Sequence, residues 1–97
     1  MRKIFPLEVP GKKAPRVIDS IKHEVRKYLK RERRKTLPKG VDFWDFDCRV
    51  GENVTNAEDT HIAAINKAID TLSEKGVSGI YLEIHSKHGH RTKKKST

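Results

Sequence analysis

The sequence predicts a two-layer α+β domain in which two helices cover one face of a three-stranded sheet. Three segments alternate apolar and polar residues, as strands do, and two segments repeat apolar residues at helical spacing. With 97 residues the chain is long enough for one domain and too short for two. We therefore expect one β-α-β-α-β domain over residues 1–90, followed by a disordered basic tail over residues 91–97.

The first strand and the first helix are predicted at residues 4–9 and 15–35. In the strand, apolar residues alternate with Pro6 and Glu8, and Pro6 favours an edge position because it has no N–H to donate. Pro15 suits the first turn of the helix for the same reason. The apolar residues of the helix fall within an arc of roughly 120°, and they are Val17, Ile18, Ile21, Val25, Tyr28 and Leu29.

Residues 41–50 give the clearest strand pattern in the chain. The outward row carries three charges and consists of Phe43, Asp45, Asp47 and Arg49. The row predicted to face the core is bulky and consists of Trp44, Phe46, Cys48 and Val50. We therefore expect this strand to be the central one.

A second helix is predicted at residues 57–75, and a third strand at residues 80–85. Thr55 and Glu58 match a capping box at the start of the helix, and Gly76 matches a C-terminal cap. Strands joined by helices are expected to be parallel with right-handed crossovers, although one antiparallel neighbour stays possible. The third strand should point Ile80, Leu82 and Ile84 inward and Tyr81, Glu83 and His85 outward.

Charge is distributed unevenly along a chain whose formal net charge is +9. Residues 1–40 carry 14 Lys and Arg against 4 Asp and Glu, whereas residues 41–85 carry 3 against 9. Such a balance favours a polyanionic partner, and we expect a nucleic acid, RNA more than DNA. An acidic protein surface is the alternative partner, and ordinary solvation of a charged helix is the third interpretation. The candidate contacts are Lys22, Arg26, Lys27, Lys30, Arg31, Arg33, Arg34, Arg91, Lys93, Lys94 and Lys95.

The outward face of the sheet offers two further hypotheses. Phe43 and Tyr81 could stack bases there, or be covered by the tail or a partner subunit. A phosphoesterase using Mg²⁺ or Mn²⁺ would need a ligand set such as Asp45, Asp47, Glu83 and His85 on neighbouring strands. Cross-strand pairing with cations such as Arg49 or Lys87 is the favoured interpretation, since flat strands lack a catalytic cleft. We therefore expect a binding domain without a metal or cofactor.

The single cysteine and the lack of long apolar runs exclude several classes of protein. Cys48 is the only cysteine, which excludes an intrachain disulfide, and its place in a core row predicts a buried, inert thiol. No apolar run approaches the roughly 18 residues of a membrane span. Residues 1–10 lack the features of a secretion signal, so a cytoplasmic location is expected.

Two runs of residues resemble a known family. They extend from Val41 to Arg49 (VDFWDFDCR) and from Arg26 to Lys35 (RKYLKRERRK), and Phe5-Pro6-Leu7 accompanies them near the start. Together they resemble a family of small bacterial proteins described only as a domain of unknown function. The resemblance spans nearly the whole chain. It implies a bacterial cytoplasmic protein and transfers no activity, ligand or site residue.

Overall fold

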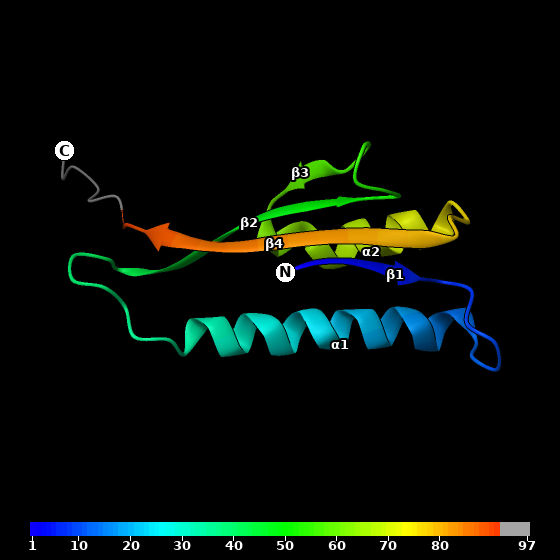
Figure 1. Ribbon diagram of the computed structural model, residues 1–97, viewed down its shortest axis with the longest axis horizontal. Coiled ribbons are helices and arrows are strands. Elements are labelled where there is room, and N and C mark those ends of the chain that lie inside the picture. Colours follow the sequence, from blue (N-terminus) through cyan, green and yellow to red (C-terminus); the bar gives the residue numbers. More distant parts are fainter. Residues whose placement is uncertain (92–97) are drawn as a thin grey trace, which may run out of the picture.

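The computed structural model describes residues 1–91, which form a four-stranded antiparallel sheet and two helices (Figure 1). The strand order is β1-β4-β2-β3. Within the described residues, neither helix combines the length and apolarity needed to cross a membrane. The elements are β1 (Arg2–Pro6), α1 (Ala14–Arg33), β2 (Phe43–Gly51), β3 (Glu58–Thr60), a 3₁₀ turn η1 (Ile62–Ala64), α2 (Ile65–Glu74) and β4 (Gly79–Gly89).

The α+β class is as predicted, but the prediction of three strands was wrong because residues 58–60 form an additional one. A turn stabilised by two asparagine side chains precedes it. Asn53 Oδ1 accepts hydrogen bonds from the N–H groups of Thr55 and Asn56, and Asn56 Oδ1 accepts one from Asn53 N–H. The chain therefore reverses where a capping box was expected, and β3 pairs with β2. Helix α2 begins only at Ile65.

The same reversal makes the sheet antiparallel, which corrects the expectation of parallel neighbours. Both β1 and β2 pair with β4 in antiparallel fashion, so β1 and β2 run in the same direction with β4 between them. The β1-α1-β2 connection thus joins two strands of the same direction that are not neighbours in the sheet. The chain reverses between β2 and β3, and β4 therefore runs antiparallel to both of its neighbours, β1 and β2.

The apolar rows face the core as the alternation predicted. Side chains from both helices and from β1, β2 and β4 join in one cluster, which places both helices on the same face of the sheet. The side chains of Ile69, Ile80, Leu82 and Ile84 are completely buried. Strand β4 therefore shares the central position that was expected for β2 alone, and β1 lies at an edge as Pro6 indicated.

Strand β4 is longer than predicted, and it pairs with all of β2. The register runs from Gly51 opposite Tyr81 to Phe43 opposite Gly89. A Cβ atom at Gly89 would overlap the Phe43 ring, so the ring lies directly on the glycine backbone. Trp44, on the helix side, donates a hydrogen bond from Nε1 to the carbonyl of Lys35 at 2.9 Å. This bond ties the far end of the sheet to the end of α1.

Truncation of a buried side chain of β4 should destabilise the folded protein. We expect Leu82→Ala to lower the free energy of unfolding by about 2–5 kcal/mol, because it leaves a cavity in a closely packed core. Ile4→Ala is the matched control, since Ile4 lies on the neighbouring strand with 62% of its surface exposed. Its cost should stay within about 0.5 kcal/mol. Urea denaturation measures both, and equal losses would contradict the assigned facing.

Candidate nucleic-acid interface

Helix α1 exposes cations on the side opposite the sheet, and most of them gather in its C-terminal half. Its buried residues include the predicted stripe from Val17 to Leu29 apart from Tyr28, which is half-buried, and this stripe fixes which side of the helix faces water. The outward side carries five exposed cations, which we call the basic ridge: Arg16, Arg26, Lys27, Lys30 and Arg34. At 1.5 Å per residue, the backbone from Arg16 to Arg34 covers about 27 Å.

None of the basic-ridge cations forms an ion pair within residues 1–91. Asp19 is the one acidic residue near the outward side, and it too is exposed. Cations on the flanks of α1, by contrast, have partners. Lys22 Nζ lies 2.6 Å from Asp70 Oδ1, and Lys35 Nζ lies 2.9 Å from Glu32 Oε2. The ridge therefore keeps its positive charge while the flanks are partly neutralised.

The structure separates the predicted helix contacts into two groups. Lys22 is held by Asp70. Arg31 lies 5.4 Å from the centroid of the Tyr28 ring, and Arg33 lies 5.4 Å from that of Phe46. These three cations thus contribute to packing.

Arg26, Lys27, Lys30 and Arg34 of the predicted set lie on the basic ridge, and Arg16 joins them although the sequence analysis missed it. Helical spacing could have found it, because Arg16 lies five turns before Arg34.

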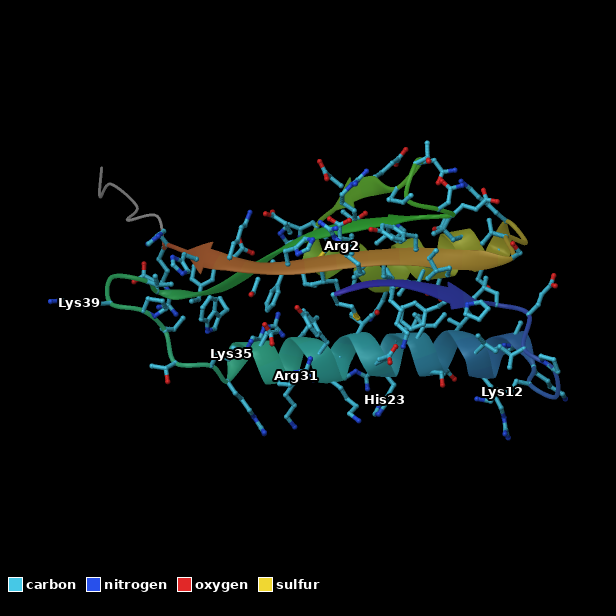
Figure 2. The ribbon with its side chains drawn as sticks, in the orientation of Figure 1. Arg2, Lys12, His23, Arg31, Lys35 and Lys39 are labelled. Atoms are coloured by element: carbon cyan, nitrogen blue, oxygen red, sulfur yellow. The ribbon has the colours of Figure 1, made fainter. Side chains whose placement is uncertain are left out.

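Further cations continue the positive charge toward both ends of the molecule. Figure 2 shows Lys12, Arg31, Lys35 and Lys39 following one another along its length. Arg91 is exposed, and its backbone N–H donates to Asp42 Oδ2 at 2.8 Å. The predicted contacts Lys93, Lys94 and Lys95 lie outside the described residues, as does the expected disorder of residues 92–97.

The two aromatic residues proposed for base stacking lie on the open face, which is the sheet face turned away from the helices. Tyr81 is only 6% exposed, so residues 1–91 themselves cover its ring. Its hydroxyl donates to Glu83 Oε1 at 2.6 Å, and this bond raises the pKa of Tyr81. Phe43 remains 36% exposed, but its ring covers Gly89. The Tyr81 ring therefore offers no free stacking platform, whereas the Phe43 ring keeps an exposed part of its surface.

The acidic residues of the open face pair with neighbours across and along the strands. Lys87 Nζ lies 2.6 Å from Asp47 Oδ1 and 3.9 Å from Asp45 Oδ2, and the hydrogen bond to Asp47 raises the pKa of Lys87. Glu83 Oε2 lies 2.9 Å from His85 Nε2. Among residues 1–91, no three His, Cys, Asp or Glu side chains gather as a metal site would require. The arrangement matches the cross-strand pairing favoured from the sequence.

Cys48 lies beneath this face, in the core. It is buried, and burial together with the nearby Asp47 and Asp45 carboxylates raises the pKa of its thiol to about 11. The thiolate needed for nucleophilic attack or metal binding is therefore scarce at neutral pH.

The hydrogen bonds to Glu83 should appear in the pH dependence of stability. Bonds from the Tyr81 hydroxyl and from His85 lower the pKa of Glu83. The stabilisation is therefore present above the unfolded pKa and is lost as the pH falls through the folded pKa. Between about pH 5 and about pH 3, Glu83→Gln should show a smaller fall in Tm than the unmodified protein. Glu52→Gln, in an exposed loop, is the control, and identical curves for the two variants would contradict the assignment.

Comparison with known proteins places the chain in a family. The model described as "Family of unknown function (DUF6172)" matches residues 1–95. No protein of curated function and no solved structure matches the chain significantly. The match covers the whole fold, including α1 and the sheet, and it agrees with the resemblance noted from the sequence. The chain therefore belongs to DUF6172, a family of unknown function.

Proposed function

We propose that the protein binds the phosphate backbone of nucleic acid through the basic ridge of α1, without catalysing a reaction. Single-stranded RNA is the expected ligand. A flexible single strand can lay successive phosphates along a straight ridge, whereas the phosphates of each strand in a duplex wind around the helix axis and leave the ridge. Because backbone contacts carry no base information, binding should be independent of sequence.

The observation that carries this proposal is that the cations on one side of α1 form no ion pairs within residues 1–91, whereas those on its flanks do. Five cations follow one exposed side of a rigid helix, and none has a carboxylate partner within residues 1–91. Residues three or four positions apart on a helix are separated by about 5–6 Å at Cβ. Long Lys and Arg side chains at this spacing can contact successive phosphates, and each contact releases condensed counterions.

Recognition through the phosphate backbone favours modest affinity. The ridge contains no aromatic side chain, and Tyr81 is buried on the other side of the sheet. Binding through the backbone alone typically gives a dissociation constant of about 10⁻⁴–10⁻⁶ M at physiological salt. Affinity should therefore fall steeply as salt is added.

The proposal is tested by reversing charge on the ridge and, separately, elsewhere. We expect Lys27→Glu with Lys30→Glu to lower the slope of log K against log salt by about 1.4, since each single-strand contact contributes about 0.7. Lys67→Glu with Lys75→Glu changes the net charge equally, at exposed positions on and just after α2. That control should keep the slope. Fluorescence anisotropy with a labelled single-stranded RNA measures it, and circular dichroism checks the helix content.

Two outcomes would reject the proposal. Equal losses in both double variants would show that total charge, and not the ridge, determines binding. A failure to bind RNA at about 50 mM salt, together with binding to polyglutamate, would favour the acidic protein partner instead.

A further inference from the structure

Strand β1 covers only part of one edge of β4. Their pairing runs from Pro6 opposite Gly79 to Arg2 opposite Glu83, and the Met1 carbonyl accepts a hydrogen bond from Ile84 N–H at 2.8 Å. Strand β4 continues to Gly89. In Figure 1 the N-terminus lies beside the middle of the β4 ribbon, so the second half of β4 extends past it. Within the described chain, residues 85–89 pair with β2 on one side and with no strand on the other.

The hydrogen-bond pattern identifies the backbone groups at this uncovered edge. The N–H of Ile84 points toward β1, whereas the carbonyl of Gly89 accepts a bond from Asp42 N–H on the β2 side. Backbone groups alternate in direction along an antiparallel strand. The N–H and C=O groups of Ser86 and His88 therefore point to the uncovered side, and both residues are exposed. An edge of this kind is a template for another strand.

Positive charge borders the uncovered edge. Figure 2 shows Arg31 in the last turn of α1 and Lys35 just after the helix, at the same end of the molecule as this half of β4. Their side chains are 70% and 60% exposed, and Glu32 between them is buried and partly neutralises the pair. Arg2, at the other end of the edge, is also exposed. The surroundings thus favour an acidic occupant over a basic one.

A second copy of the chain fits this edge poorly. Antiparallel pairing of two β4 edges would bring the Arg31 and Lys35 side chains of both copies to the same side of the joined sheet. Like charges at short range oppose such an arrangement. Nucleic acid cannot supply the alternating amide N–H and C=O groups that a strand edge recognises.

We propose that residues 85–89 of β4 form a docking edge for an extended, acidic segment of a partner protein. The segment adds a strand beside β4, collinear with β1, and forms hydrogen bonds to the backbones of Ser86 and His88. Its carboxylates lie beside Arg31 and Lys35. The basic ridge points away from the sheet, so this interaction uses a different surface from the proposed RNA contact.

The test combines a designed peptide with a variant of the edge. The probe is a synthetic peptide of alternating Glu and Val, and its control carries N-methyl groups on alternate residues, which removes the donors facing β4. Any purification tag is removed before the measurement. We expect the unmodified peptide to bind and to slow amide hydrogen exchange at Ser86 and His88. The methylated peptide should bind at least about tenfold more weakly, as expected for the loss of hydrogen bonds.

A proline substitution tests the same edge from the protein side. Ser86→Pro removes one outward N–H, and it leaves the β2 ladder intact because that N–H is not directed toward β2. We expect about tenfold weaker peptide binding, whereas Ser86→Ala retains the donor and should bind as before. Thermal unfolding verifies that both variants fold. Equal binding of the two peptides or of the two variants would overturn the proposal, and so would a homodimer that dissociates in Ser86→Pro.

Discussion

The packing of the apolar stripe of α1 against the sheet determines the rest of this structure. The stripe runs from Val17 to Leu29 and is only as wide as one side of the helix. A rotation of α1 by a single position would expose apolar side chains and bury charged ones, and burying an unpaired charge is costly. The helix therefore has one orientation, and the cations on its opposite side must face water. The basic ridge is a consequence of core packing as well as of composition.

The cations of α1 differ in whether they have a partner, and the difference follows their distance from the sheet. Those on the flanks reach acidic or aromatic partners, as Lys22 reaches Asp70 and Arg33 reaches the ring of Phe46. Those farthest from the sheet lie beyond the reach of such partners. The acidic residues of the open face find cations of their own, such as Lys87 for Asp47. Within residues 1–91, the basic ridge therefore keeps a positive charge that no carboxylate neutralises.

Periodicity predicted the helices and the inward rows, because both depend on local alternation and burial, and Pro6 predicted the edge position of β1 because it has no N–H to donate. Periodicity missed β3, because its three residues, Glu58–Thr60, are all polar and show no alternation of polar and apolar side chains. That strand depends on the asparagine turn before it and on pairing with β2, and the Thr55 and Glu58 pattern equally matches a helix start. The alternation of side chains along β4 also placed Tyr81 on the correct face of the sheet, but it did not show that the ring would be buried. Among the cations, the sequence could not distinguish Lys22 from Lys30, since the partner of Lys22 lies 48 residues away.

The central claim is that the outward side of α1, and not the sheet, contacts the polyanion. Titration of ¹⁵N-labelled protein with a single-stranded RNA, followed by amide chemical shifts, tests it residue by residue. The account predicts that the largest shifts lie on α1 between Arg16 and Arg34, concentrated at the ridge positions, and that they diminish as salt is added. Shifts concentrated on the open face of β2 and β4, with α1 unchanged, would contradict it.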